Sequence, residues 1–503
     1  MPYSSLMLFN MVTEEIKLLE TEALEIDDNN YVLEAQKAAK TPSHAPSQVT
    51  ISTINEVVVG LDDEAQTIID QLTRGSMQLD NVSIVGMPGL GKTTLAKKVY
   101  HDPKIMSHFH IRAWCCVSQV YCKKDLLLEI LACIVPKNSN EYSKMNENDL
   151  AEELYKLLKG SRYAIVLDDV WDIVAWNVLE RSFPNDANGS RILLTSRLYE
   201  MALLVKPTGK PHPLRQLTDD ESWELLQKKL VHKEGYPPAL QVLGMQIAKN
   251  CNGLPLAVVI IAGILGTLEQ EGWEEIAERL SSNIVCGTNQ CMSILELSYK
   301  HLPSYLKPCL LYFGAFLEDQ EIPVWRLTQL WIAEGFVQEN ELKSIEDTAE
   351  DYIMALISRS LVMVAKQRSI GGVKTCYIHD LLHEFCVAKA KEENFLQLVH
   401  RYDELFNFDE PPNLHQLCIY SQRKHFVNLR LFYPHIHSLL FSAQGHESYG
   451  KIYNFSFVFC LKLLRVLDLG EINLGFLFPS EIAMLVQLRY LSLRGQMKDT
   501  HHQ

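Results

Sequence analysis

Residues 86–94 read Gly-Met-Pro-Gly-Leu-Gly-Lys-Thr-Thr, a complete GxxxxGK[ST] phosphate-binding loop. The apolar run Val82–Val85 before it is typical of a buried strand, and residues 95–100 continue as a helix. Glycines allow backbone N–H groups to turn toward a phosphate at the helix N-terminus, where a lysine and a hydroxyl complete the site. The alternative is a glycine-rich turn without a ligand. The residues predicted to contact a nucleotide here are Gly86, Gly89, Gly91, Lys92, Thr93 and Thr94.

Length, net charge, apolar runs and cysteine spacing limit the kinds of protein that this chain can be. With 503 residues the chain is too long for one core, and about three or four domains are expected. A net charge of −15 disfavours general DNA or RNA binding, which uses a basic face. No leader peptide is recognisable, and the longest apolar run, Leu254–Leu265, is too short to span a bilayer. Cysteines without a C-x-x-C pair are typical of reduced thiols, so we expect a cytoplasmic location, with peripheral membrane association as the alternative.

Strands alternate with helices from residue 57 to 216, which indicates a parallel sheet covered on both faces, the α/β fold of a P-loop NTPase. The second strand comes between the phosphate loop and the third strand along the chain, and we expect it to lie between them in the sheet as well. The strands are expected at Val82–Val85, Ile111–Val117, Tyr163–Leu167, Arg191–Thr195 and Pro213–Leu217.

Two strand ends supply chemistry beside the phosphate loop. The apolar strand at 163–167 runs into Asp168 and Asp169, at the sheet edge where nucleotide binds. Asp168 is the expected Mg²⁺ ligand, together with the Thr93 hydroxyl, and Asp169 is placed to orient or deprotonate an attacking water. The next strand ends in Arg197, whose forked guanidinium can sense a γ-phosphate. Without these neighbouring motifs Arg197 would be an ordinary surface arginine.

Helices dominate beyond residue 217. Residues 217–296 are expected to form a helical domain, and residues 297–395 a winged-helix domain with a hairpin at Leu361–Val364 and Thr375–Ile378. Four side chains at the end of this part could gather on one side of a helix as Zn²⁺ ligands, but their spacing matches no familiar zinc finger and apolar neighbours favour a packed helix. They are Cys376, His379, His383 and Cys386.

The two ends of the chain differ in pattern. Residues 1–36 are acidic with an apolar stripe that predicts an amphipathic, coiled-coil-like helix, and residues 37–56 are typical of a linker. Near the other end, L-x-x-L-x-x-L-x-L at residues 461–469 recurs at residues 485–493, within the period of leucine-rich repeats. Residues 396–503 are therefore expected to begin a leucine-rich-repeat solenoid that is cut short.

The order of these motifs resembles that of plant disease-resistance proteins, which join an NB-ARC nucleotide-binding module to leucine-rich repeats. The likeness runs from about residue 57 to 493. Trp171, after the acidic pair, points to the coiled-coil branch of the family, and the motif sequences are most similar to those of the late-blight resistance type. The segments that carry the resemblance are Val58-Val59-Gly60, the phosphate loop, Arg112–Gln119, Leu167–Trp171, Thr195-Ser196-Arg197, Gly253–Ala257, Cys309–Phe316 and Ile378-His379-Asp380-Leu381.

The resemblance implies further nucleotide contacts. Val59 and Gly60 would lie near the adenine, and Pro255 would pack against the base, although a proline in the first turn of a helix is the simpler interpretation. His379 would reach from the winged-helix domain to the β-phosphate of ADP, supported by Asp380; a buried structural histidine is the alternative. Both the N-terminal segment and the repeat array are shorter than in typical members of the family.

Three functions follow as hypotheses. The first is a signalling switch, closed with ADP and open with ATP, in which hydrolysis is at most a slow reset. The family likeness adds an immune receptor that senses a pathogen effector or a guarded host protein and triggers defence and hypersensitive cell death, with self-oligomerisation or another such receptor as further partners. The second is a turning-over ATPase motor or remodeller. The third is a repeat-based adaptor or decoy with a vestigial nucleotide domain, which the intact Lys92, Asp168 and Arg197 disfavour.

Overall fold

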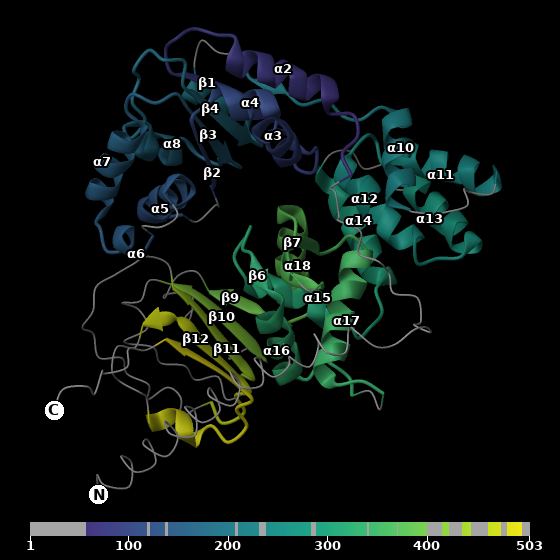
Figure 1. The fold of residues 1–503 in the computed structure, drawn as a ribbon. Helices are drawn as coiled ribbons and strands as arrows, with labels where there is room; N and C mark the ends of the chain where they lie inside the picture. The colour runs from purple at the N-terminus through teal and green to yellow at the C-terminus, as the bar shows by residue number, and fades with distance from the viewer. Residues whose placement is uncertain are drawn as a thin grey trace, which may run out of the picture.

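A computed structural model describes residues 57–117, 121–135, 139–206, 210–230, 238–282, 288–339, 342–369, 371–399, 415–421, 435–443, 461–473 and 480–494. Along the chain these residues form an α/β unit, a helical unit, a winged-helix unit and a second parallel sheet (Figure 1). The helix and linker predicted for residues 1–36 and 37–56 lie outside the described residues.

The first sheet contains five parallel strands, which confirms the predicted P-loop NTPase fold class. Its order differs from the expectation, because β4 and not β2 lies between the phosphate-loop strand β1 and the acidic strand β3. Burial explains the difference: all six residues of β4 are buried, as a central strand requires, whereas burial alternates along β2, which lies at the edge. The order across the sheet is β2 (Ile111–Cys116), β3 (Tyr163–Asp168), β4 (Arg191–Ser196), β1 (Asp80–Val85) and β5 (His212–Pro213).

The last strand is shorter than predicted. Only His212 and Pro213 pair with β1, so the strand expected at Pro213–Leu217 is wrong in extent. Pro213 has no N–H to continue a ladder. The next residue still donates its N–H to Val85, and the chain then turns into the helical unit.

Helices cover both faces of this sheet (Figure 1). One layer contains α2 (Asp62–Thr73), α3 (Lys92–Tyr100) and α4 (Pro103–His108). The opposite layer contains α5 (Lys123–Ile134), α6 (Ser139–Tyr142), α7 (Glu147–Leu158), α8 (Ile173–Glu180) and α9 (Tyr199–Val205).

The helical unit begins with a capping box, in which Thr218 and Glu221 satisfy each other's backbone N–H groups. Its third helix starts with Pro255 in the first turn and is buried along most of its length. The predicted helical character is confirmed, but one helix, α14, runs through the expected boundary at residues 296 and 297, so the domain limits stay predictions. The helices are α10 (Asp219–Lys229), α11 (Pro238–Asn250), α12 (Pro255–Leu265), α13 (Gln270–Ser282) and α14 (Thr288–His301).

The winged-helix unit contains the predicted hairpin, since β7 and β8 pair antiparallel and β6 adds to β8. Its last helix, α18, starts directly after His379 and buries an apolar face formed by residues such as Leu381 and Phe385. The elements are α15 (Lys307–Leu311), η2 (Tyr312–Ala315), β6 (Ile322–Pro323), α16 (Val324–Glu334), α17 (Ile345–Ser358), β7 (Met363–Gln367), β8 (Val373–Tyr377) and α18 (Asp380–Glu392).

The second parallel sheet carries one strand from each predicted repeat. Leu467 pairs with Leu491, so the register between the last two strands equals the sequence period of the leucine pattern. Assignment of this segment to a leucine-rich-repeat solenoid stays a prediction. Helix α16 packs on the sheet, and Arg326 reaches Asp468 at 2.8 Å. The strands and the short helix are β9 (Gln397–Val399), β10 (Gln416–Ser421), β11 (Ser438–Ala443), β12 (Val466–Asn473), η5 (Ser480–Met484) and β13 (Tyr490–Arg494).

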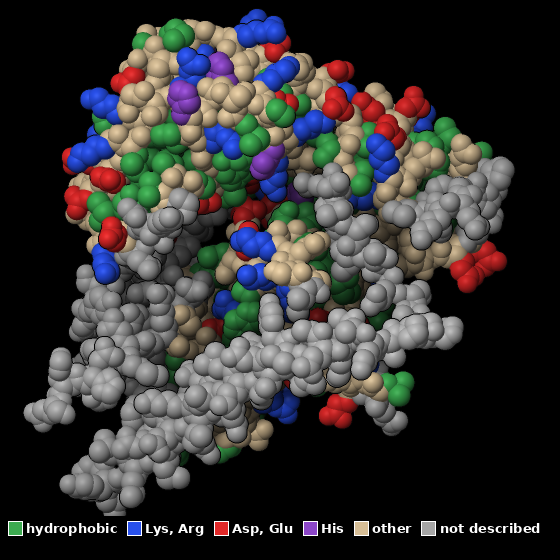
Figure 2. All heavy atoms as spheres, viewed as in Figure 1, with side chains coloured by type: hydrophobic (Ala, Val, Ile, Leu, Met, Phe, Trp, Pro, Cys, Tyr) green, Lys and Arg blue, Asp and Glu red, His purple; other side chains and the backbone are tan. Residues whose placement is uncertain are grey.

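The charged side chains on the surface agree with the net charge of −15, which disfavours a basic nucleic-acid-binding face. On the face drawn in Figure 2, acidic and basic side chains are interspersed over the α/β unit and do not form a single basic surface. Among the described residues, every helix is too short or too polar to cross a bilayer.

Candidate functional site

The phosphate-binding loop has the backbone shape its glycines predict. Gly89 and Gly91 have φ angles of +79° and +93°, which L side chains rarely adopt, and Gly91 caps helix α3. Lys92 is only 7% exposed, and its Nζ donates to the Met87 carbonyl of the loop at 3.2 Å. Burial lowers the pKa of the Lys92 ammonium, while the charges of nearby carboxylates oppose this shift. The loop is therefore a formed cradle with a buried cation, and it fits a phosphate group.

The helical unit contacts this cradle directly. The N–H of Leu256 donates to the Gly89 carbonyl at 3.3 Å, and a Cβ placed on Gly89 would lie 3.1 Å from the Leu256 Cβ. Pro255, the preceding residue, begins helix α12 at this contact. In the segment before helix α2, Val59 is buried and Gly60 adopts φ +72°. The structure thus places Pro255 next to a contact with the phosphate loop and Gly60 against the start of helix α10, and contact of Val59, Gly60 and Pro255 with a base stays a prediction.

Asp168 and Thr93 form the predicted metal-binding pair. Thr93 Oγ1 donates to Asp168 Oδ1 at 3.1 Å, and Thr195 Oγ1 donates to the same oxygen at 2.5 Å. Burial raises the pKa of the Asp168 carboxyl, and the two hydroxyl contacts oppose that shift. A carboxylate and a hydroxyl at the end of a parallel strand are oxygen ligands of the kind that Mg²⁺ takes, so this pair fits the ion.

Asp169 is held by backbone and side chain together. Its φ is +54°, and its N–H donates to Thr195 Oγ1 at 2.8 Å. The carboxylate turns to Arg197, with 3.4 Å between Asp169 Oδ2 and a guanidinium nitrogen. Burial raises the pKa of the Asp169 carboxyl, and the Arg197 charge lowers it.

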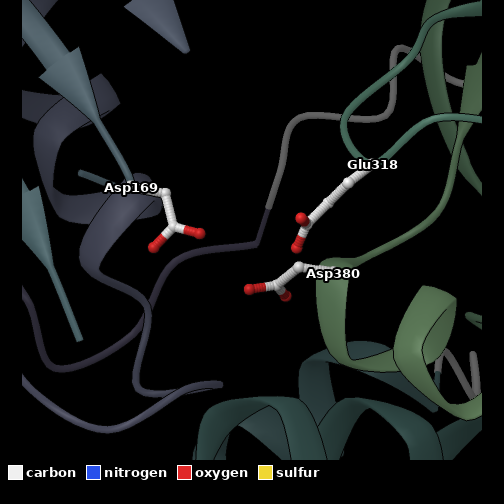
Figure 3. A group of neighbouring side chains, drawn as sticks. All are labelled: Asp169, Glu318 and Asp380. Atoms are coloured by element: carbon white, nitrogen blue, oxygen red, sulfur yellow. The ribbon is translucent and has the colours of Figure 1, made fainter. Parts of the chain in front are cut away.

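Arg197 joins the sheet to the winged-helix unit. One terminal nitrogen of the guanidinium contacts the carboxylates of Asp169, at 3.4 Å, of Glu318, at 3.5 Å, and of Asp380. The other nitrogen donates to Glu384 at 2.8 Å. Figure 3 shows three of these carboxylates converging from the two units. Asp380 and Glu384 belong to the first turns of helix α18, so the proposed phosphate sensor is bound by the winged-helix unit.

Trp171 supports the same guanidinium from its other side. The Arg197 Cζ lies 4.2 Å from the centroid of the indole ring, within the range of a cation–π contact. The sequence identified Trp171 only as a family marker. Its position explains why a large aromatic residue follows the acidic strand.

Negative charge exceeds positive charge at this junction. Burial and the neighbouring Asp319 raise the pKa of Glu318 to about 8, and burial with Asp380 raises the pKa of Asp319 to about 7. Burial would also raise the pKa of the Asp380 carboxyl, but the His379 and Arg197 charges outweigh it and hold that pKa well below its usual range. The Arg197 guanidinium is therefore the cation that compensates the ionised Asp380.

His379 lies beside this cluster. It is the N-cap of helix α18, and its ring contacts the Asp380 carboxylate, which also accepts from the Leu381 N–H at 2.8 Å. Contact of His379 with a phosphate stays a prediction. Asp380 has a more direct place than the sequence implied, because it pairs with Arg197 itself as well as with His379.

Among the described residues, the carboxylates close enough to share a cation are Asp169, Glu318 and Asp380, and Arg197 lies among them. Two of the four residues considered as Zn²⁺ ligands contact backbone carbonyl groups instead. His383 Nε2 contacts the Phe316 carbonyl at 2.8 Å, and Cys386 Sγ donates to the Leu310 carbonyl at 3.4 Å. These partners agree with the packed-helix interpretation.

Sequence reasoning missed Glu318 and Glu384 as partners of Arg197. Glu318 and Asp319 form an acidic pair directly after the apolar family segment that ends at Phe316, and that change from apolar to acidic is the available signal. Glu384 lies one helical turn after Asp380, which puts both on one face of α18.

Comparison with known families identifies two domains. Residues 61–235 match the NB-ARC domain, and residues 315–386 match the disease resistance protein winged helix domain. These ranges contain the phosphate loop, the acidic strand, Arg197, Glu318 and Asp380.

Two relatives from Solanum demissum cover most of the chain. The late blight resistance protein homolog R1B-14 is 40% identical over 487 residues, 96% of this chain and 36% of that protein. The late blight resistance protein R1-A is 40% identical over 483 residues, 91% of this chain and 35% of that protein. The chain thus spans about a third of the length of these relatives.

Solved structures give a weaker likeness. A STAND signal-transduction ATPase with a tetratricopeptide-repeat sensor from Pyrococcus horikoshii matches 70% of this chain and 45% of its own, at 18% identity and a TM-score of 0.44. The matched domains and the relatives carry the assignment: the chain is a member of the NB-ARC family of plant disease-resistance proteins.

Proposed function

We propose that this chain is an ADP/ATP-dependent signalling switch of plant immunity, closed with ADP and opened by ATP. The observation that carries the proposal is the position of Arg197. The strand end beside the phosphate loop presents this guanidinium, yet its partners Glu318, Asp380 and Glu384 come from the winged-helix unit. One side chain therefore serves both the nucleotide edge and the contact between the units.

The proposed mechanism is competition for Arg197. A γ-phosphate supplies negative charge that the ADP-bound site lacks. When Arg197 turns toward that charge, the ionised Asp380 loses this cation in a largely buried place, which is unfavourable. To change the ratio of open to closed chains from about 1:99 to 99:1, ATP must bind the open state more tightly than the closed state by about 5.5 kcal/mol. Two or three charged hydrogen bonds to the γ-phosphate, at about 1.5–3 kcal/mol each, supply this amount.

Asp168 and Asp169 have separate proposed roles. Asp168, with Thr93, holds Mg²⁺, which when bound neutralises phosphate charge. Asp169 orients or deprotonates water for hydrolysis. In this structure the Asp169 carboxylate is paired with Arg197, and burial raises its pKa. Because Asp169 is paired with Arg197, it is less available to accept a proton from water, which supports slow hydrolysis that resets the switch.

The biological role is proposed from family membership. Two curated relatives are named late blight resistance proteins, and the chain spans about a third of their length. We propose a cytoplasmic or membrane-peripheral receptor that responds to a pathogen effector or a guarded host protein and promotes hypersensitive cell death. Self-assembly, or assembly with another receptor of the family, is the proposed active form.

The test is the nucleotide content of the purified chain, with and without Lys92→Ala. A switch retains ADP, exchanges it slowly, and loses it in the variant. Rapid multiple-turnover hydrolysis by the wild-type chain would instead establish the motor or remodeller alternative. Signalling that is unchanged in Lys92→Ala would establish the adaptor or decoy alternative.

A further inference from the structure

A second set of charged contacts lies at the junction between the α/β unit and helix α10. Arg215 follows strand β5 and forms a two-pronged ion pair with Glu221: each terminal guanidinium nitrogen is 2.7 Å from one carboxylate oxygen. A paired fork of this kind fixes orientation as well as charge. Hydrogen bonding from Arg215 lowers the pKa of the Glu221 carboxyl to about 2, so the pair is fully ionised at neutral pH.

The same guanidinium reaches the segment before helix α2. One of its terminal nitrogens donates to the Gly60 carbonyl at 3.2 Å, and Nε lies 3.4 Å from a Glu64 carboxylate oxygen. Arg215 therefore joins the first turn of α10 to the 59–61 segment and the first turn of α2, which follow one another in the chain.

The 59–61 segment packs closely against the start of α10. A Cβ placed on Gly60, whose φ is +72°, would lie 2.7 Å from the Leu217 side chain and 2.8 Å from the Glu221 carboxyl carbon. Glu221 also closes the capping box of α10. Movement of Arg215 or Glu221 would therefore release this segment from the helix.

The segment borders the phosphate-binding loop. Leu61 Cδ1 lies 3.9 Å from a Cβ placed on Gly91, and the Leu214 side chain lies 3.7 Å from one placed on Gly86. Lys92 and Asp168 fix the phosphate end, so the apolar wall formed with Leu61 and Leu214 is where a base would lie. This placement rests on the nucleotide site proposed above.

We propose that Arg215 is a positioning residue that holds the 59–61 segment against helix α10 and so controls release of the adenine end of the nucleotide. The helical unit then holds the site at two places: at the phosphate end through Leu256 and Gly89, and at the base end through Glu221 and Arg215. Loss of Arg215 loosens the base end and leaves the phosphate end intact.

The experiment compares a ligand with a base and a ligand without one. Release of N-methylanthraniloyl-ADP is followed by stopped-flow fluorescence, and affinity for inorganic pyrophosphate is measured by calorimetry, on the whole chain. In Arg215→Ala we expect release to accelerate about tenfold, the loss of one charged contact, with pyrophosphate affinity unchanged. Arg215→Lys stays impaired because lysine lacks the fork that reaches Glu221 and the Gly60 carbonyl together.

The matched control is Arg279→Ala. Arg279 also pairs with a glutamate on a helix of the same unit, and its side chain is 48% exposed against 41% for Arg215. Release at the wild-type rate in Arg215→Ala, or loss of pyrophosphate affinity in the same proportion, overturns the inference. A wild-type chain that binds neither ligand contradicts the proposed nucleotide site instead, so the two failures are distinguishable.

Discussion

Arg197 and Asp380 form an ion pair although 183 positions separate them in the chain. The pair joins the end of strand β4 to the start of helix α18, and both side chains are largely buried, at 9% and 16% exposure. Because Arg197 also contacts Asp169 and lies over Trp171, its charge is placed between the nucleotide edge and the winged-helix unit.

Lys92→Ala should weaken nucleotide binding. The ammonium is buried in the phosphate loop, and a charged hydrogen bond contributes about 1.5–3 kcal/mol, so affinity for ADP should fall about tenfold to a hundredfold. Lys98→Ala on the same helix is the control, because Lys98 pairs with the exposed Asp62 instead. Calorimetric titration with ADP measures both, and equal affinities in the two variants would refute the role of Lys92.

Stability should fall as pH rises, partly through Glu318. Burial and Asp319 raise the pKa of the Glu318 carboxyl from 4.5 to about 8. The folded chain then keeps a proton that the unfolded chain has lost, so this stabilisation is full below about pH 4.5 and is lost as pH approaches about 8. Its slope is at most about 1.4 kcal/mol per pH unit.

Thermal unfolding at about pH 6 and about pH 8.5 tests this dependence. The drop in midpoint between the two should be smaller in Glu318→Gln than in the wild type. Glu278→Gln, at an exposed position of α13, should keep the wild-type drop. An unchanged drop in Glu318→Gln contradicts the assignment.

Gly263→Ala should destabilise the contact between helix α12 and the winged-helix unit. A Cβ at Gly263 would lie 2.0 Å from the Arg359 carbonyl oxygen, so the backbone must move. We expect a loss of about 1–3 kcal/mol, although alanine favours a helix by about 1 kcal/mol. Urea unfolding measures it against Gly266→Ala, where the nearest atom is at 3.3 Å in the same helix. Equal stability of the two variants would show that the contact can relax.

Arg326→Ala should weaken the attachment of the second sheet to helix α16. Arg326 pairs at 2.8 Å with Asp468, whose side chain is 2% exposed, and its removal leaves a buried charge without that partner. Such a loss costs about 3 kcal/mol, whereas breaking the exposed Lys366–Glu321 pair with Lys366→Ala should cost less than about 1 kcal/mol. Urea unfolding with limited proteolysis compares them, and similar stabilities would contradict a structural role for Arg326.

Local patterns predicted the parts of the site that local chemistry determines. The phosphate loop needs glycines and a lysine at fixed spacing, and Asp168 ends a continuous apolar strand, so both were visible in the sequence. The hairpin and the helices of the helical unit followed in the same way from periodicity and turn residues.

Long-range packing determined the rest. Sequence order suggested that β2 lies beside β1, but the strand buried on both faces, β4, occupies that place. The partner of Arg197 was equally inaccessible, because Glu318 and Glu384 reach it only after the winged-helix unit packs on the sheet. Whether Pro255 and His379 contact a nucleotide stays a prediction.

The central claim is that the Arg197–Asp380 pair holds the ADP-bound, closed state. The most direct measurement is the ratio of ADP to ATP released from purified Asp380→Val, compared with the wild type and with Asp351→Val, which changes an exposed aspartate of the same unit. We predict that the wild type and Asp351→Val carry mainly ADP and that Asp380→Val shifts toward ATP, because Arg197 has lost one of its winged-helix partners and turns more readily to a γ-phosphate. Asp380→Val that retains as much ADP as the wild type, or more, would contradict the account.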